Sequence, residues 1–207
     1  LSLDLPGGTQ RLVSYRAPAG EARAELRDRG SKILAIVAPA ADREAPQRRL
    51  ERVRKEHPGA THHCWARRLG WPPEERGADA GEPAGTAGVP MLQVLRGAGL
   101  SDVLAVVVRW YGGTKLGKGG LARAYAGAVR TAVDELPTVL CVPSDLVRIE
   151  ASYEAIGAVK RLVRPPEVEM VEEEYAEKVR FVLRVHRDRR SELDGSLADL
   201  GLESQAV

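Results

Sequence analysis

Short apolar runs alternate with polar stretches along most of the chain. Residues 12–26 alternate weakly, which predicts one or two edge strands near the start. Residues 33–37 are apolar and rich in β-branched side chains, as in a strand. In residues 42–57, Leu50 and Val53 lie on one side of an arginine-rich stretch, which predicts an amphipathic helix. Strands and helices are therefore expected to alternate from the start.

The middle of the chain contains the clearest strand. Residues 103–108 are continuously apolar and run into a glycine-rich turn, and the alanine-rich stretch 120–136 predicts a helix after that turn. Upstream, residues 61–69 predict an extended segment, residues 70–83 a polar loop, and residues 91–95 part of a helix. The strand, glycine turn and helix form the most informative unit of the sequence.

A second pattern starts after Pro137, in the order strand, helix, strand, strand, helix. One more strand in residues 201–207 would complete the split β-α-β arrangement of ferredoxin-like domains. We therefore expect two α+β domains, residues 1–137 and residues 138–207. The expected elements are a strand at 139–149, a helix at 153–162, strands at 168–175 and 178–185, and a helix at 189–200.

Composition is that of a globular protein, with 43% hydrophobic and 29% charged residues. No apolar run approaches the roughly 20 residues that a membrane helix needs, and the first residues lack the pattern of a secretory signal. A cytoplasmic protein without a membrane partner is expected. Cys64 and Cys141 lie far apart and match no CxxC spacing, so we expect buried thiols, with no disulfide, metal or cofactor.

The charge is distributed unevenly along the chain. Residues 1–138 contain 21 Lys and Arg against 15 Asp and Glu, whereas the remainder contains 10 against 14. If the protein binds phosphates, the first part is the better candidate.

The glycine-rich turn, residues 112–119, reads GGTKLGKG. Gly112, Gly117 and Lys118 match the spacing of a nucleotide-binding P-loop, but Gly119 replaces the Ser or Thr that would bind magnesium. A P-loop NTPase is therefore not expected.

The same turn still favours anions. Glycines let backbone N–H groups approach a ligand, and a helix N-terminus adds positive potential. Arg109, Lys115, Lys118 and Arg123 would surround it with positive charge. The alternative is that the glycines only permit close packing and the cations are solvated. Likewise, the aromatic residues at 110–111 could stack on bases or belong to the core.

A second candidate cluster is His62, His63 and Cys64 with Glu82. On a strand, His62 and Cys64 face one side and His63 the other, so the three cannot converge on one ion. Neither a metal site nor a catalytic thiol is expected, and no catalytic residue is assigned.

Three segments resemble motifs of the YigZ/IMPACT family. They are HPGATHHCWARRL, GADAGEPAGTAGVPML and VVVRWYGGTKLGKGGLARAY, which together span residues 57–125. The resemblance implies an N-terminal domain like domain two of ribosomal protein S5. It implies a ferredoxin-like C-terminal domain similar to the last domain of elongation factor G. Eukaryotic members resemble translation regulators, and bacterial members are described as nucleic-acid binders.

Matched to the family, the residues form two groups. A possible surface site would contain His62, Asp79, Glu82 and Thr86, although Ala80 replaces the family's Asp beside it. The second group is the anion site, which Lys118 joins through the P-loop spacing. It comprises Arg109, Tyr111, Gly112, Gly113, Lys115, Gly117, Lys118, Gly119, Gly120 and Arg123.

These features favour a translation-associated protein that binds RNA or the ribosome through the glycine turn. Two other functions stay open. One is an enzyme that acts on a nucleotide or phosphorylated small molecule, with Glu82 or Asp79 as acid or base. The other is a protein-interaction module that regulates translation or a stress response.

Overall fold

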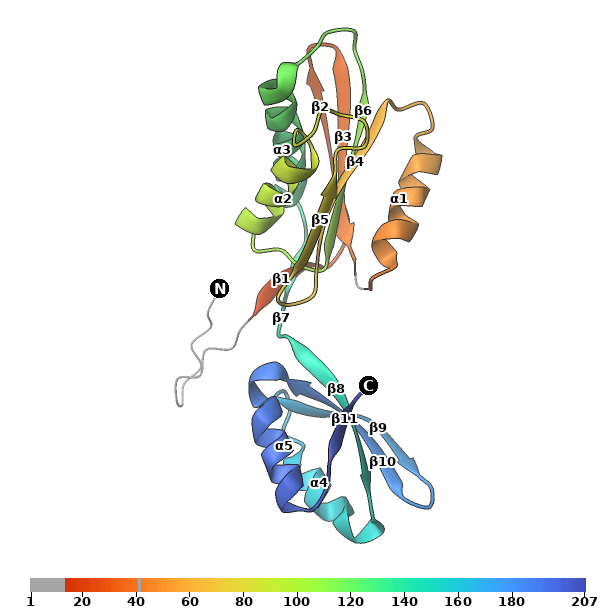
Figure 1. Ribbon diagram of the computed structural model, residues 1–207, viewed down its shortest axis with the longest axis vertical. Coiled ribbons are helices and arrows are strands. Elements are labelled where there is room, and N and C mark those ends of the chain that lie inside the picture. The colour runs from red at the N-terminus through yellow and green to blue at the C-terminus, as the bar shows by residue number, and fades with distance from the viewer. Residues whose placement is uncertain (1–13, 41) are drawn as a thin grey trace. The chain divides into compact units, whose positions relative to one another are not determined.

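The computed structural model describes residues 14–40 and 42–207 (Figure 1). The strand prediction that includes Leu12 and Val13 falls partly outside these residues. The chain divides into two compact units, one formed by Tyr15–Cys141 and one containing Val142–Val207. We call them the N-terminal and C-terminal units. The division lies after Cys141 rather than after Pro137, because residues 138–141 pair with a strand of the N-terminal unit.

A five-stranded antiparallel sheet forms the centre of the N-terminal unit, in the order β2-β3-β6-β4-β5. Its middle strand is the apolar run predicted from the sequence. Burial of seven of its eight residues explains why they are almost all apolar. The strands are β2 (Ala22–Asp28), β3 (Ser31–Pro39), β4 (His62–Leu69), β5 (Glu74–Ala78) and β6 (Val103–Trp110).

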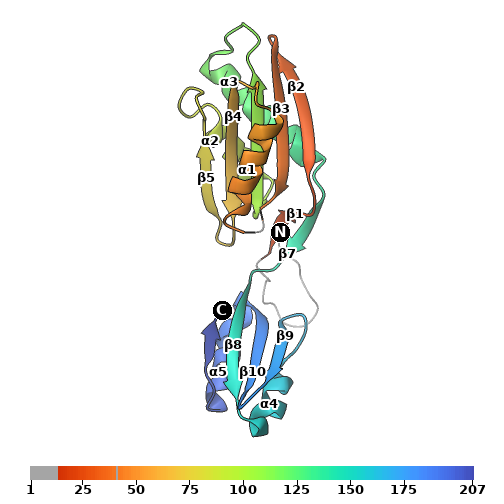
Figure 2. The same cartoon turned by 90° about the vertical axis from the view of Figure 1, so that its right-hand side faces the viewer.

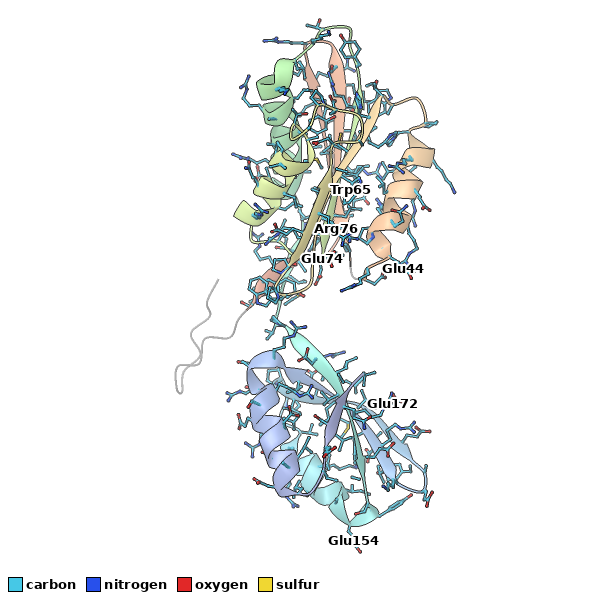
Figure 3. All side chains as sticks on the ribbon, viewed as in Figure 1. Glu44, Trp65, Glu74, Arg76, Glu154 and Glu172 are labelled. Atoms are coloured by element: carbon cyan, nitrogen blue, oxygen red, sulfur yellow. The ribbon has the colours of Figure 1, made fainter. Side chains whose placement is uncertain are left out.

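Helices cover both faces of this sheet (Figure 1). On one face lie α2 (Gly88–Gly97) and α3 (Gly117–Asp134), which bury Met91, Leu95 and Tyr125 against the sheet. On the other lies α1 (Ala45–Glu56), whose Leu50 and Val53 pack into a second cluster. Trp65, which is labelled in Figure 3, packs against this second cluster from β4.

Two sequence predictions in this region are wrong. The polar stretch 70–83 is not all loop, since it contains the edge strand β5. Edge strands are often rich in charged residues, and Glu74 and Arg76 of β5 form an ion pair at 3.0 Å (Figure 3). The segment therefore lacks the alternating apolar residues from which a strand is predicted. The stretch 139–149 is not one strand. Pro143 separates β7 (Thr138–Cys141), which pairs with β1 (Tyr15–Pro18), from the following strand.

The C-terminal unit is a four-stranded antiparallel sheet in the order β11-β8-β10-β9 (Figure 2). A 3-10 turn at Tyr153–Ala155 precedes α4, so the predicted helix is split at its start. Helices α4 and α5 cover one face and bury Val159, Leu193 and Leu197. The elements are β8 (Ser144–Ala151), α4 (Ile156–Leu162), β9 (Val168–Tyr175), β10 (Val179–His186), α5 (Arg190–Asp199) and β11 (Ser204–Ala206).

Within the described part of the chain, no helix combines the length and the apolar character that a membrane crossing requires.

Candidate functional site

A buried ion pair lies at the end of the central strand. Arg109 is the penultimate residue of β6, between Ile33 of β3 and His62 of β4. Its Nη1 lies 2.6 Å from Oε1 of Glu82, and the two side chains are only 5% and 4% exposed. The Tyr125 hydroxyl of α3 donates to the same Glu82 oxygen at 2.8 Å. Glu82 is therefore held between the sheet and α3.

The loop before α2 is closed by Asp79. Its carboxylate accepts backbone N–H groups of Gly85 and Ala87 at 2.8 Å and of Gly88 at 2.9 Å. Burial acts to raise the pKa of Asp79, but these three donors outweigh it and lower the pKa below its usual value of 3.8. Thr86 is buried and donates its hydroxyl to the Pro83 carbonyl at 2.6 Å. Asp79 thus occupies the N-terminus of α2 as an internal anion.

The residues of β4 alternate between the two faces as the sequence predicts. His62 Nδ1 lies 3.1 Å from the Ala80 carbonyl, and its Nε2 lies 3.8 Å from Glu82 Oε1. His63 contacts the His57 carbonyl instead, at 3.1 Å, and burial lowers its pKa. Among residues 14–40 and 42–207, no three His, Cys, Asp or Glu side chains are arranged to hold a metal ion.

Cys64 lies close to Asp79, Glu82 and Tyr125, and we call these four residues together with Arg109 the buried cluster. Its thiol is fully buried and donates to the Asp79 carbonyl at 2.8 Å, with the Tyr125 hydroxyl 3.4 Å away. Burial raises the pKa of Cys64 to about 12, and the nearby carboxylates of Glu82 and Asp79 act in the same direction. The thiol stays protonated at neutral pH and is a poor nucleophile.

The glycine loop, which we define as residues 111–116, connects β6 to α3. Tyr111 is 46% exposed, and its hydroxyl donates to the Gly113 carbonyl at 2.7 Å. Gly112 lies against the turn between β2 and β3. A Cβ atom on Gly30 would lie 2.8 Å from the Gly112 carbonyl oxygen, so the two backbones meet without room for side chains. The loop is therefore fixed to this turn.

Three cations in or near the glycine loop face solvent. Lys115, Lys118 and Arg123 are exposed and form no ion pair with any residue that the structure describes. Lys118 lies in the first turn of α3, which begins at Gly117 without a side-chain cap. Exposed N–H groups and free cations at the start of a long helix make a favourable environment for an anion.

The structure divides the residues singled out in the sequence into an exposed and a buried group. Lys115, Lys118, Arg123 and the glycines at 112, 113, 117 and 119 are exposed, and Gly120 is partly buried. Arg109 is separate from them, because it is buried and bound to Glu82. Glu82 and Thr86 likewise lie inside rather than on the surface, where they hold the loop between β5 and α2.

Ser31 connects the two groups and was missed as a site residue. It is fully buried, and its hydroxyl oxygen accepts from Arg109 Nη2 at 3.1 Å and from the Gly112 N–H at 3.3 Å. Its place directly after the Gly30 turn indicates a hairpin but no partner. Strand pairing across 78 positions created the contact.

Comparison with known proteins identifies the family. Residues 29–133, about half of the chain, match the model of the Impact N-terminal domain. The chain belongs to the IMPACT family. The IMPACT member YigZ of Escherichia coli is 34% identical over 191 residues, which cover 91% of this chain and 94% of YigZ. A member from Thermus thermophilus is 39% identical over 155 residues, covering 75% of this chain and 84% of that protein.

The similarity of IMPACT members extends over both units. A crystal structure described as a hypothetical protein is 32% identical, with a TM-score of 0.70, and the alignment covers 94% of this chain and 97% of that one. The matched Impact domain contains Ser31, Glu82, Arg109 and the whole glycine loop. The buried cluster and the exposed cations therefore belong to the part of the chain that defines the family.

Proposed function

We propose that this IMPACT protein is a translation-associated RNA-binding protein, and that the glycine loop and the start of α3 bind the phosphate backbone. The observation that carries the proposal is the set of three exposed cations, Lys115, Lys118 and Arg123, without acidic partners among the described residues. They lie at or near the start of α3, whose first N–H groups have no side-chain cap. Such a site recognises phosphates and carries little base specificity.

The fold of each unit supports a setting in translation. The C-terminal unit has the element order β-α-β-β-α-β and the sheet order β11-β8-β10-β9, which favour a ferredoxin-like domain. We assign the N-terminal unit to the fold of domain two of ribosomal protein S5, on the basis of the family resemblance. Both folds occur in components of the translation machinery, so the assignment agrees with binding to RNA or the ribosome.

The contacts within the buried cluster argue against a catalytic role for its residues. Glu82 is bound to Arg109 and Tyr125, and Asp79 is occupied by three backbone donors. The raised pKa of Cys64 disfavours a thiolate. A general acid or base needs a free oxygen within reach of the substrate. We therefore assign these side chains to holding the loops in place.

The test is equilibrium binding of the full chain to short single-stranded RNAs at several salt concentrations. Changing Lys115 and Lys118 together to alanine should weaken binding to all sequences alike. If each lysine neutralises one phosphate, the slope of log K against log salt should flatten by about 1.4. Both lysines are exposed, so the fold should persist, which circular dichroism checks.

A matched control removes two cations elsewhere. Arg161 and Arg164 of the C-terminal unit are exposed and form no ion pair with any described residue. Their double alanine variant should bind RNA like the wild type. An unchanged affinity and slope in the lysine variant would overturn the proposal. Tight, salt-insensitive binding of a mononucleotide would indicate a small-molecule site instead. Absence of RNA binding by the wild type would favour a protein-interaction module.

A further inference from the structure

The turn between β2 and β3 carries an arginine in an unfavourable conformation. Asp28 pairs with Ser31, so Arg29 and Gly30 form a two-residue turn, and both have positive φ, at 45° and 82°. Two-residue turns with two positive φ values strongly prefer Asn-Gly or Asp-Gly, because Asn and Asp tolerate the left-handed region better than other side chains. Arg29 therefore occupies a position where asparagine would serve the fold better. Such an outlier suggests a role for the side chain itself.

This turn is fixed to the glycine loop. Gly30 meets the Gly112 backbone, as described above, and Ser31 accepts the Gly112 N–H at 3.3 Å. Farther along, a Cβ atom on Gly127 would lie 4.0 Å from Leu26, which places α3 over β2. The tip of the hairpin and the start of α3 thus lie at the same end of the N-terminal unit, as Figure 1 also shows.

The hairpin tip has a net positive charge. Arg27 and Arg29 are exposed and form no ion pair with any described residue. Of the acidic residues in the hairpin near the tip, Glu25 is bound to Lys32 at 3.0 Å, which leaves Asp28. The hairpin tip therefore adds positive charge at the same end of the N-terminal unit as Lys115 and Lys118, with Arg27 on the face of β2 opposite to Leu26 and α3. Arginine is also well suited to phosphate, because its guanidinium donates two parallel hydrogen bonds.

We propose that Arg27 and Arg29 belong to the same phosphate-binding surface as Lys115 and Lys118, so that a single-stranded RNA backbone continues from the glycine loop across the tip of the β2–β3 hairpin. The proposal rests on the proposed function and extends it to two arginines of the β2–β3 hairpin, of which Arg29 is the first residue of the matched Impact domain. It requires the RNA to cross the junction of Gly30 and Gly112, two residues without side chains.

The experiment uses the full chain and a fluorescently labelled single-stranded RNA of mixed sequence. The test variant is Arg27→Ala with Arg29→Asn, because asparagine keeps the left-handed turn while removing the charge. Each phosphate contact that releases about 0.7 counterion makes binding about 5-fold tighter at about 0.1 M salt than at about 1 M salt. Two lost contacts multiply to about 25-fold. The variant should therefore bind about 25-fold more weakly and flatten the salt slope by about 1.4. A variant with lysine at both positions should keep most of the slope.

Three controls separate the outcomes. The Arg161→Ala, Arg164→Ala variant should bind like the wild type. Urea unfolding of the hairpin variant, followed by tryptophan fluorescence, should show that its N-terminal unit is intact. If the hairpin variant binds normally while the Lys115→Ala, Lys118→Ala variant is weakened, the hairpin inference is overturned and the proposed function stands. If neither variant differs from the wild type, both are overturned. If the lysine-for-arginine variant loses as much as the neutral one, the charge interpretation is overturned.

Discussion

The buried pair of Arg109 and Glu82 makes a prediction about stability that is independent of any ligand. Replacing Arg109 by methionine keeps much of the volume but leaves the Glu82 carboxylate in a site where its side chain is 4% exposed. Among the described residues, the Tyr125 hydroxyl at 2.8 Å and His62 at 3.8 Å are the polar side chains that remain near that carboxylate oxygen. An uncompensated charge in such a place is strongly destabilising.

The expected loss for Arg109→Met is about 3–5 kcal/mol, because one partner of a buried pair is removed while the other stays. Tyr125→Phe removes one hydrogen bond to the same carboxylate and should cost about 1.5–3 kcal/mol. The double variant Glu82→Gln, Arg109→Met has no stranded charge, so its loss should be smaller than the sum of the two single losses. We expect a coupling energy of at least about 2 kcal/mol.

Tryptophan fluorescence in a urea titration measures this effect in the full chain. All three tryptophans, Trp65, Trp71 and Trp110, lie in the N-terminal unit, so the signal reports on that unit alone. With a slope of about 2 kcal/mol per molar urea, Arg109→Met should lower the midpoint by about 2 M.

The matched control is Arg48→Met in the same unit. Arg48 pairs with Asp42 at 2.8 Å, but both side chains are more than half exposed, so the loss should stay below about 1 kcal/mol. If Arg109→Met shifts the midpoint no more than Arg48→Met does, the pair is solvated and the reasoning fails. Additive losses in the Glu82–Arg109 cycle would also refute it.

Two further predictions concern Asp79 and Cys64. Asp79→Asn should cost about 1–3 kcal/mol near neutral pH, since an amide leaves one of the N–H donors facing an NH₂ group. Because the pKa of Asp79 is lowered in the folded state, its contribution is complete above its usual value of 3.8 and is lost as the pH falls below it. The difference between variant and wild type in urea titrations should therefore shrink below about pH 4, and a constant difference would contradict the assignment. Cys64, with its buried thiol and a pKa of about 12, should react with a thiol reagent at pH 8 only after unfolding, whereas the partly exposed Cys141 should react in the native state. Labelling of a Cys141→Ser variant, with and without urea, measures the reactivity of Cys64. Rapid labelling of the native variant would show that the residues around Cys64 admit the reagent.

The pattern of apolar residues predicted most of the sheet and helices, because burial on one or both sides leaves a direct trace in sequence. The strand β6 and the helix α3 are examples, although α3 starts at Gly117 rather than Gly120. The edge strand β5 left no such trace, since its residues are polar and its strand conformation depends on pairing with β4. Pairing between distant segments is not encoded in a local pattern.

The candidate site was harder to predict for the same reason. A lysine next to glycines at a helix start is exposed in most folds, and Lys115 and Lys118 are exposed here. Arg109 follows a run of buried apolar residues within β6, and its local sequence fits a solvated cation as well as a buried one. Its state depends on Glu82, 27 positions away, and on Ser31, 78 positions away. Arg109 and Glu82 were both candidate residues from the sequence, but the sequence did not show that they form an ion pair.

The ion pair of Arg109 connects the loop between β5 and α2, residues 79–87, to the glycine loop. Glu82 binds Arg109, Arg109 donates to Ser31, and Ser31 accepts the N–H of Gly112. Each bond in this chain is buried or partly buried, whereas Lys115 and Lys118 at its outer end are exposed. Buried polar networks of this kind fix the positions of the groups they connect. The loop between β5 and α2 then needs no ligand of its own, because it holds the glycine loop and the β2–β3 turn together at the surface where we propose that phosphates bind.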